Sequence, residues 1–466
     1  MRTLKLYDSL TGQKQTFEPL EAGKLRMYVC GVTVYDFCHI GHARIMVAFD
    51  MITRYLRQQG WDLTYVRNIT DVDDKIIRRA AENGETTDAL TERFIRFMHE
   101  DERALGVLPP DVEPRATDHI REIIRLIETL IGHDVAYVAD NGDVYFQVEK
   151  FDSYGKLSHR KLEDMLAGAR IDIEEAKRNP LDFVLWKAAK SGEVAWPSPW
   201  GDGRPGWHIE CSAMSMKYLG ESFDIHGGGP DLKFPHHENE IAQSEAATGK
   251  TFARYWMHAG AVRVNKEKMS KSLGNFFTIR DVLKQHPAEV IRFFLVSSHY
   301  RSPIDYSEDS LHEARQALDR FYNALEGLDL TGSPTTHAGG WAERFHDAMH
   351  DDFNSREAIA VLFEMAREIN RHKSAGDTER AAALGCLLVK LAEPLGILQQ
   401  TPEAWLKGQR RERAISEEEI EALIAERTEA RANKNWAESD RIRDVLKEKG
   451  VILKDGREGT TWQWEA

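Results

Sequence analysis

The stretch Leu25-Arg-Met-Tyr-Val-Cys-Gly-Val-Thr-Val34 decides the fold. It is apolar and β-branched without strict alternation, which is typical of a strand buried on both faces of a parallel sheet. Apolar residues then recur at helical spacing from Ala43 to Gln58, and Gly60 stands where a helix C-terminal cap is expected. A second apolar run, Leu63 to Ile69, follows. The stretch therefore predicts a βαβ unit.

This unit also predicts where a ligand binds. A right-handed crossover places a nucleotide crevice beyond the carboxyl ends of the strands, where the loop Tyr35 to His42 lies. The stretch contains neither GxGxxG nor GxxxxGK[ST]. An ordinary dinucleotide-binding fold and a P-loop are therefore disfavoured.

Composition excludes several classes of protein. The chain has 466 residues, of which 42% are hydrophobic and 30% charged, so it is expected to form two to four soluble globular domains. No window approaches the ~18 consecutive apolar residues of a membrane helix, and Met1 to Glu18 has no apolar run behind a basic start. We expect neither secretion nor contact with a membrane.

Cysteine content predicts the cellular location, and net charge limits how the chain could bind nucleic acid. Four cysteines are too few for a disulfide framework in a chain of this length, so the cytoplasm is the expected location. The net charge of −14 gives no general attraction to nucleic acid. Any RNA binding must therefore use a local basic surface.

The patterns divide the chain into four parts of an α/β protein. Residues 1–115 and 206–310 are predicted to form a Rossmann-like, parallel-sheet catalytic domain. Residues 116–205, with a mixed pattern, form an insertion into it. Helical periodicity predicts a helical bundle over 311–402, and two charged helices with a strand-like tail predict a small mixed α/β domain over 403–466.

Two short motifs suit a nucleotide. His39-Ile-Gly-His42 stands at a predicted helix start, where free backbone N–H groups favour phosphate and Gly41 allows close approach. Lys268-Met-Ser-Lys-Ser272 offers two lysines and two hydroxyls in a short loop, which suits a mobile clamp on phosphates. Taken singly, the first motif could equally be a helix start with two exposed histidines. A short lysine cluster taken alone is usually solvated surface.

A third constellation predicts a metal site. In Phe234-Pro-His-His-Glu-Asn-Glu240, His236 and Glu240 lie four residues apart on one face of a predicted helix, whereas His237 is expected to face another side. With Cys30 and Cys211 they would form a tetrahedral zinc site from three separate stretches. Taken alone, each stretch is more often structural, as a buried cysteine or a solvated helix face.

In this order, the two nucleotide motifs resemble the paired signatures of class I aminoacyl-tRNA synthetases. With the zinc constellation, the resemblance narrows to the cysteinyl-tRNA synthetase family and runs nearly end to end. The matching segments are Met27 to Asp36, Arg67 to Lys75, Gly203 to Cys211, Phe223 to Gly229, Pro235 to Glu240 and Lys268 to Ser272.

The resemblance implies a role for each matching residue. It implies one Zn²⁺ per chain on the four residues named above, Mg²⁺ accompanying ATP, and a monomer that uses ATP, L-cysteine and cysteine tRNA. It implies catalytic roles for His39, His42, Lys268 and Lys271, with ATP contacts at His39, Gly41, His42 and Lys271. It implies walls of the cysteine pocket at Gly31, Thr70, Trp207 and His226, and tRNA contacts at Arg431, Trp436, Asp440 and Asp455.

The C-terminal segment supports an RNA partner independently. Between Arg427 and Arg457 there are nine Lys and Arg residues against six Asp and Glu residues. Trp436, Trp462 and Trp464 would add stacking surfaces beside this positive charge. The alternative, equally weighted for Trp436, is that the tryptophans form a small core.

Two other functions stay open at this point. One is a ligase that joins cysteine to an amino sugar in mycothiol synthesis; it lacks the anticodon region, which this chain has. The other is a non-catalytic RNA- or zinc-binding derivative, which has no need of both nucleotide motifs. Residues 109–205 contain no evident hydrolytic constellation, so we expect selection of the amino acid at binding and no editing domain.

Overall fold

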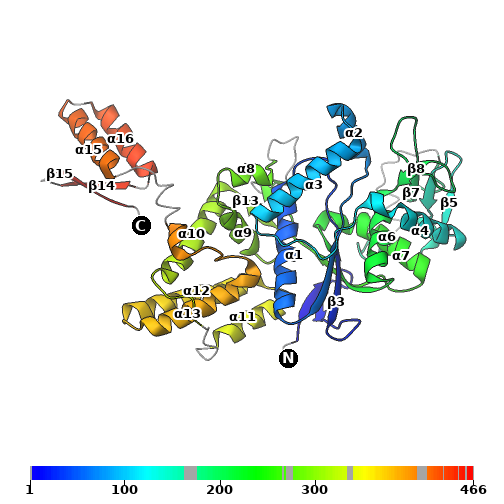
Figure 1. Cartoon of the computed structure of the whole chain (residues 1–466), viewed down its shortest axis with the longest axis horizontal. Coiled ribbons are helices and arrows are strands. Elements are labelled where there is room, and N and C mark those ends of the chain that lie inside the picture. Colours follow the sequence, from blue (N-terminus) through cyan, green and yellow to red (C-terminus); the bar gives the residue numbers. More distant parts are fainter. Residues whose placement is uncertain are drawn as a thin grey trace.

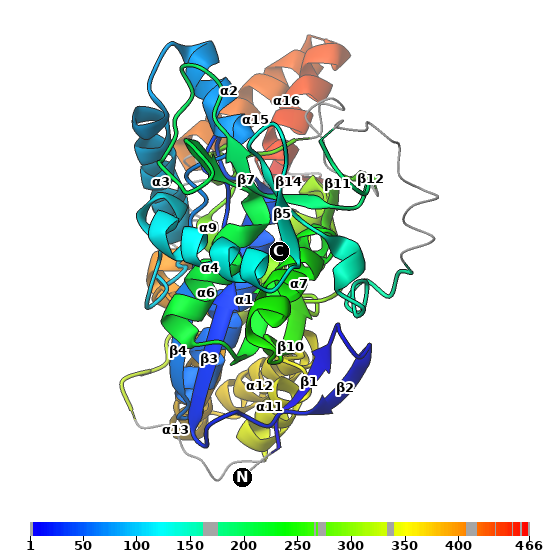
Figure 2. The same cartoon turned by 90° about the vertical axis from the view of Figure 1, so that its right-hand side faces the viewer.

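The computed structural model describes residues 3–161, 176–264, 267–268, 276–332, 340–406, 417–433, 435–449, 451–456 and 459–464. Its central sheet is parallel, with the strand order β10-β9-β3-β4. Its four strands are β3 (Lys24–Val29), β4 (Asp62–Arg67), β9 (Phe223–Gly228) and β10 (Ala253–His258). Figure 1 labels β3 of this sheet, and Figure 2, turned by 90°, labels β4, β3 and β10. Strand β3 pairs with β4 on one side and β9 on the other, so the strand order reverses there and a crevice is expected at its carboxyl end.

Helix α1 (Ile40–Gln58) connects β3 to β4 and completes the predicted βαβ unit. It begins three residues before the predicted start, because the His39 side chain caps its first turn. The strand ends five residues earlier than predicted. A Cβ on Gly31 would lie 1.7 Å from the Asn68 carbonyl oxygen. The segments that follow β3 and β4 therefore approach each other too closely at this point to leave room for a side chain.

Alternate residues of β3 pack into two different hydrophobic cores. This confirms the prediction of a strand buried on both faces of the sheet. Leu25, Met27 and Val29 pack in the cluster that contains α1. Tyr28 and the following Cys30 pack in the cluster that contains Cys211 and Met214. The opposite face of the sheet is therefore covered by α6 (Trp207–Leu219), which packs against α7 (His236–Thr248). This alternation turns Cys30 toward α6.

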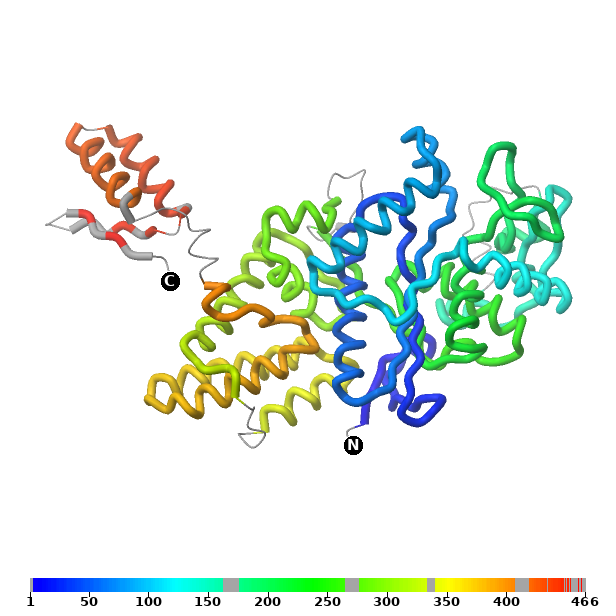
Figure 3. Tube along the Cα trace, in the orientation of Figure 1, coloured from blue at the N-terminus to red at the C-terminus, as the bar shows by residue number. Residues whose placement is uncertain are grey.

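The insertion forms a second, antiparallel sheet with the order β5-β6-β7-β8. Figure 1 labels β5, β7 and β8 of this sheet, and Figure 3 traces the chain in the same orientation. The insertion comprises β5 (Ala136–Val138), β6 (Val144–Phe146), β7 (Phe183–Ala188) and β8 (Gly203–Pro205), with η1 (Ala116–His119), α4 (Ile120–Gly132) and η2 (Val148–Lys150). Its core includes Ile209 of α6 and Ala242 of α7. The insertion thus supports the two helices that carry candidate metal ligands.

The remaining elements of the N-terminal half complete the body around the central sheet. They are the hairpin β1 (Lys5–Asp8) and β2 (Gln13–Thr16), the helices α2 (Asp74–Asn83) and α3 (Thr87–Ala104), and η3 (Pro230–Lys233). A small sheet of β11 (Val262–Val264), β12 (Glu267–Lys268) and β13 (Ile304–Tyr306) follows, with α8 (Ile279–Leu283) and α9 (Ala288–Val296).

A helical bundle follows, as predicted. It consists of α10 (Glu308–Leu325), α11 (Trp341–His350), α12 (Ser355–Ser374), α13 (Thr378–Ala392) and η5 (Glu393–Leu395). A short helix at 402–406 also belongs to it, because the Trp405 ring stacks on Tyr322 with centroids 4.8 Å apart. The bundle therefore extends beyond the predicted boundary at residue 402.

The last unit consists of α15 (Glu417–Ala432), α16 (Trp436–Glu448) and the antiparallel pair β14 (Val451–Gly456) and β15 (Gly459–Trp464). Ile420, Ile442, Leu446 and Val451 form its core. This unit matches the small mixed domain predicted from the sequence. Among the described residues, no helix has both the length and the apolar character needed to cross a membrane.

Candidate active site

Four side chains predicted to bind a metal meet in one buried cluster, which we call the thiol cluster: Cys30, Cys211, His236 and Glu240. Cys30 follows the last residue of β3, and its N–H donates to the Gly227 carbonyl of β9 at 3.0 Å. Cys211 lies on α6. His236 and Glu240 lie one turn apart on α7, so both point to the same side.

Distances within the thiol cluster are those of groups able to share one ion. The Sγ atoms of Cys30 and Cys211 are 3.7 Å apart, and both residues are free thiols. Glu240 Oε1 lies 3.4 Å from Cys30 Sγ and 3.1 Å from His236 Nε2. The four ligand atoms all lie within 4.8 Å of one another. Two thiols, one imidazole and one carboxylate form a donor set that suits tetrahedral zinc.

Two more histidines orient the ligands. His226 Nε2 lies 2.8 Å from Glu240 Oε2, so the other carboxylate oxygen, Oε1, faces the thiols. His208 Nδ1 lies 2.9 Å from His236 Nδ1, which leaves His236 Nε2 directed at the cluster. Partners of this kind fix the orientation of metal ligands. Neither supporting contact was predicted from the sequence.

The side chains of the thiol cluster shift one another's pKa values. Burial alone would raise the pKa of Glu240, but the facing imidazoles of His226 and His236 lower it to about 2. Burial also acts to raise the pKa of Cys211, but the Cys30 thiol that donates to it and the nearby His236 lower it to about 6. Burial acts to lower the pKa of His236, but Glu240 and Cys211 in turn raise it to about 10. At neutral pH the imidazolium therefore supplies positive charge to these two anions, and a bound metal ion would replace it.

The expected orientation of His237 was wrong. Its Nε2 atom lies 4.0 Å from Glu240 Oε1, because residues three apart on a helix also share a face. Its Nδ1 atom lies 2.8 Å from His258 Nε2, and His258 Nδ1 lies 2.8 Å from Ser9 Oγ. Cys30, His226, His237 and Glu240 form a second group of possible ligands. This group overlaps the thiol cluster but lacks the second thiol.

A third group of possible ligands, His99, Glu102 and Glu113, lies elsewhere. Arg67 Nη2 is 2.7 Å from each of the two carboxylates, so they already face a buried cation. The arginine therefore already neutralises this third group, which makes it a weaker candidate for a metal than the thiol cluster.

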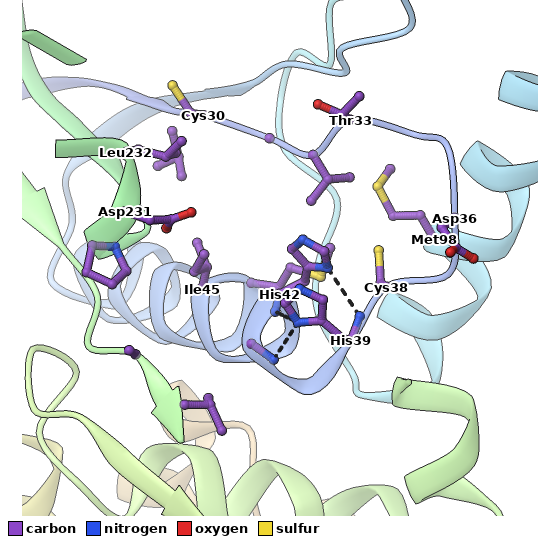
Figure 4. Close-up of a pocket in the computed structure, with 18 of the residues that line it drawn as sticks. Cys30, Thr33, Asp36, Cys38, His39, His42, Ile45, Met98, Asp231 and Leu232 are labelled. Carbon is purple, nitrogen blue, oxygen red and sulfur yellow. Dashed lines mark hydrogen bonds between the residues drawn. The ribbon is translucent and has the colours of Figure 1, made fainter. Parts of the chain in front are cut away.

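A cavity of about 780 Å³ opens beside the thiol cluster. Cys30, Gly31 and Trp207 line one part of it, and His39 and His42 line another. Figure 4 shows the Cys30 thiol on one side of this space and the two imidazoles on the other. The cavity therefore joins the two predicted sites, one for a metal and one for a nucleotide.

Hydrogen bonds to backbone N–H groups hold the rings of His39 and His42 at the start of α1. The N–H groups of Gly41 and His42 donate to His39 Nδ1 at 3.0 and 3.3 Å, and the His39 N–H donates to His42 Nδ1 at 3.2 Å (Figure 4). The rings stack with centroids 3.7 Å apart. Because each Nδ1 accepts a hydrogen bond, a neutral ring carries its proton on Nε2. Burial lowers the pKa of His42 well below its usual value, so its ring is neutral and presents an N–H donor.

The four residues expected at the cysteine pocket fall into two pairs. Gly31 and Trp207 line the cavity, and the Trp207 ring lies over His236 with centroids 4.3 Å apart. Thr70 and His226 are 2% and 0% exposed and contact other buried groups. Thr70 donates to Glu210 at 3.1 Å, and His226 contacts Glu240. Contact of the substrate with this second pair stays a prediction.

The lysine loop is described only in part. The backbone of Lys268 belongs to β12, which pairs with β11 beside the cavity-lining residue Arg263. Lys271 lies outside the described residues, so its contact with ATP stays a prediction.

In the C-terminal unit, Trp436 is 60% exposed, and Arg431 and Asp440 are also on the surface. The mini-core alternative therefore does not apply to Trp436. It applies to Trp462, which packs against the core and donates from Nε1 to Glu421 at 2.8 Å. The side chains of Asp455 and Trp464 lie outside the described ones.

Comparisons with known proteins agree with this geometry. Residues 16–316 match the model of the tRNA synthetases class I (C) catalytic domain, residues 344–399 the DALR domain, and residues 416–462 the cysteinyl-tRNA ligase anticodon binding domain. The chain is 63% identical over 465 residues to a cysteine–tRNA ligase of Hahella chejuensis, covering 99% of both chains. It is 64% identical over 462 residues to that of Stutzerimonas stutzeri, again covering 99% of both.

The fold also matches solved structures. A methionyl-tRNA synthetase of Mycobacterium tuberculosis, bound by methionyl-adenylate, aligns with a TM-score of 0.60 at 15% identity. The alignment covers 80% of this chain and 92% of that one. At this identity the likeness establishes the shared architecture of the parallel-sheet body and the helices that follow it.

Proposed function

Because this chain belongs to the cysteine–tRNA ligase family of class I aminoacyl-tRNA synthetases, we propose that it selects cysteine through zinc held by Cys30, Cys211, His236 and Glu240. The chain is a cysteine–tRNA ligase, an enzyme that joins cysteine to tRNA. Its anticodon-domain match argues against an amino-sugar ligase, since that enzyme lacks this region. One observation carries the zinc proposal. Two thiols, an imidazole and a carboxylate are buried beside the cavity, and their ligand atoms all lie within 4.8 Å of one another.

The thiol cluster is favoured over the overlapping group because of its donors. It has two sulfur ligands, which zinc prefers over a single one with additional imidazoles. His226 already contacts Glu240 Oε2, and His237 already contacts His258. These contacts fit a role for His226 and His237 in positioning the ligands and not in binding zinc. When bound, zinc would supply a Lewis acid for which the soft thiolate of the substrate is a good ligand.

The proposed first step is activation of cysteine by ATP. The substrate carboxylate attacks the α-phosphate, a bond forms between the carboxylate oxygen and phosphorus, and pyrophosphate leaves. The Nε2–H groups of His39 and His42, together with the N-terminus of α1, are positioned to donate to phosphate oxygens. Lys268 and Lys271 would neutralise charge that develops on the pyrophosphate. Mg²⁺ would accompany the ATP.

In the proposed second step a hydroxyl at the 3′ end of cysteine tRNA attacks the carbonyl carbon of the cysteinyl adenylate, an ester bond forms, and AMP leaves. The exposed Trp436 ring begins α16, with Arg431 at the end of the preceding helix. An exposed indole beside positive charge suits stacking of an unpaired base. Arg431, Trp436, Asp440 and Asp455 are proposed to contact tRNA. Location in the cytoplasm is part of the same proposal and is supported by four free thiols. A monomer is proposed from the family resemblance.

A chain that ends at Leu406 is expected to activate cysteine but to charge tRNA poorly. Every proposed catalytic residue precedes residue 276, whereas the exposed tryptophan lies in the removed unit. Ending at Leu406 keeps Trp405 on the bundle. Charging efficiency should fall roughly 10- to 100-fold, since base stacking on an aromatic ring contributes about 1–3 kcal/mol per base. Cysteine-dependent exchange of pyrophosphate into ATP should persist.

The matching point variant is Trp436→Ala, with Leu20→Ala as a control at another exposed apolar side chain, 41% exposed. Exchange and charging are measured on the same preparations. Equal charging by the shortened and full chains would move tRNA recognition to another surface. Absence of cysteine-dependent exchange in the full chain would contradict the activity itself.

Lys271→Ala is expected to lower the rate of adenylate formation by roughly two to four powers of ten, as for the loss of other charge-stabilising groups. Affinity for cysteine should change much less, because the lysine acts on the transition state. Pre-steady-state measurement of adenylate formation checks this. Lys284→Ala, which removes an exposed lysine that pairs with Asp281, is the control. An unchanged rate in the Lys271 variant would refute the clamp.

A further inference from the structure

The Tyr28 side chain, on β3, carries a buried hydroxyl group beside the thiol cluster. The side chain is 0% exposed, and its hydroxyl makes no hydrogen bond with any residue that the structure describes. A buried polar group without a partner is costly, so it calls for an explanation. We propose that this hydroxyl donates a hydrogen bond to the Cys211 thiolate when the cluster binds zinc, which makes Tyr28 a positioning residue for a metal ligand. This inference rests on the proposed function.

The place of Tyr28 on the strand turns its side chain toward the cluster. Side chains two residues apart on a strand point to the same face, so Tyr28 and Cys30 both point toward α6. Both pack in the hydrophobic cluster that contains Cys211. The centroid of the Tyr28 ring lies 5.3 Å from that of the His226 ring. Because tyrosine is much longer than cysteine, its hydroxyl extends farther from the strand than the Cys30 thiol does, toward the helix that carries Cys211.

The groups of the thiol cluster act electrostatically on this hydroxyl. Burial raises the pKa of the Tyr28 phenol well above its usual value, and Cys211, Cys30 and Glu240 raise it further. Nearby negative groups have this effect on a phenol, and Cys211 has the largest effect of the three. The phenol therefore keeps its proton at neutral pH, and the Cys211 sulfur is the favoured acceptor for it.

Binding of zinc would change the hydrogen-bond partners of Cys211. In this structure the Cys30 thiol donates to Cys211 Sγ at 3.7 Å. Cysteine binds zinc as the thiolate, so this proton leaves when both sulfurs bind the metal. Cys211 then loses its donor and gains negative charge. The Tyr28 hydroxyl can replace the lost donor, and a charge-assisted hydrogen bond from it would fix the orientation of the sulfur.

The balance of charge around zinc favours such a donor. Two thiolates and the Glu240 carboxylate together carry more negative charge than one Zn²⁺ ion neutralises. The thiolate of the substrate would add to this excess. A hydrogen bond to the Cys211 sulfur withdraws electron density from it and so reduces the repulsion of a further thiolate. Tyr28 would thereby help the cluster to accept the substrate thiol.

Tyr28→Phe is expected to weaken zinc binding by the full chain roughly 10-fold, at the lower end for loss of a hydrogen bond to a charged group because sulfur is a weak acceptor. The variant removes one oxygen atom, which has a partner only when zinc is bound. Competition with a chelator measures the zinc affinity. Without metal, the variant should unfold at the same temperature as the unmodified chain or at a higher one, because it loses no hydrogen bond.

Cobalt provides a second measurement, which reports on the sulfur atoms directly. Co²⁺ takes the place of zinc in the full chain, and the absorption band for charge transfer from sulfur to cobalt is recorded. Loss of a hydrogen bond leaves more electron density on sulfur, so the band should move to lower energy in Tyr28→Phe. Tyr322→Phe, which removes a buried phenol that donates to Glu289 in the bundle at 2.9 Å, is the matched control. It should change neither the zinc affinity nor the cobalt spectrum.

The possible results separate the alternatives. Zinc affinity within about twofold of that of the unmodified chain would overturn the inference. Weaker binding with an unshifted sulfur band would assign the hydroxyl to His226 Nδ1, which is also buried without a partner among the described residues, and would overturn it too. Lower stability of metal-free Tyr28→Phe would show that the hydroxyl already has a partner without zinc, with the same consequence. Failure of the unmodified chain to bind one zinc ion would instead contradict the proposed function.

Discussion

Cys211→Ser is expected to leave less than one zinc ion per chain and to abolish cysteine-dependent pyrophosphate exchange. The variant removes one of two thiols that lie 3.7 Å apart, and a serine hydroxyl stays protonated at neutral pH and binds zinc weakly. The fold should largely persist, because the ligands lie at the edge of a sheet with its own core. Metal analysis, exchange kinetics and a thermal unfolding scan measure the three effects.

Cys30→Ser should behave in the same way, since Cys30 is the other proposed sulfur ligand. Cys386→Ser is the matched control, because this thiol is also buried but lies on α13 in the bundle. Treatment of the unmodified chain with a chelator should remove exchange activity, and zinc should restore it. Full zinc content in both ligand variants would refute the assignment, and the overlapping group with His226 and His237 would then be tested in the same way.

Serine is expected to support pyrophosphate exchange at least 10⁴-fold less efficiently than cysteine, as the accuracy of translation requires. Serine differs from cysteine in one atom, and an apolar pocket separates such near-isosteres by only about a hundredfold. The required ratio corresponds to roughly 5.5 kcal/mol or more. The size of the pocket is therefore insufficient.

The donor chemistry of the site supplies the difference. A cysteine thiol has an ordinary pKa of about 8.5 and deprotonates readily on binding zinc. A hydroxyl is far less acidic and is a harder ligand. Alanine, which has neither group, is the matched substrate control, and serine should be nearly as poor as alanine. Exchange with serine within about a hundredfold of exchange with cysteine would show that the metal does not discriminate.

The sequence alone determined the parts of this protein that depend on local patterns. The run from Leu25 to Val34, the helical spacing after Ala43 and the run from Leu63 predicted the βαβ unit, because burial on two faces and one-faced burial leave different periodicities. The family resemblance selected the four proposed zinc ligands, since residue type alone leaves 18 histidines and 76 Asp and Glu residues as candidates beside the four cysteines. The i, i+4 spacing of His236 and Glu240 follows from helix geometry alone.

The tertiary structure decided which other residues surround those four. His226 comes from β9 and His208 from α6, and only the packing of these elements on α7 brings both rings to the cluster. Glu210 acquires its partner, Thr70, because the end of β4 lies beside α6. Such contacts join residues far apart in sequence and leave no periodic signal.

Packing likewise decided between exposed and buried tryptophans. Trp436 and Trp462 both stand in the C-terminal segment, and residue type predicted the same role for both. The first is 60% exposed at the start of α16, whereas the second lies on β15 against the small core and donates to Glu421. Local residue type fixes what a side chain can do, but its exposure depends on which face of its element the rest of the chain covers.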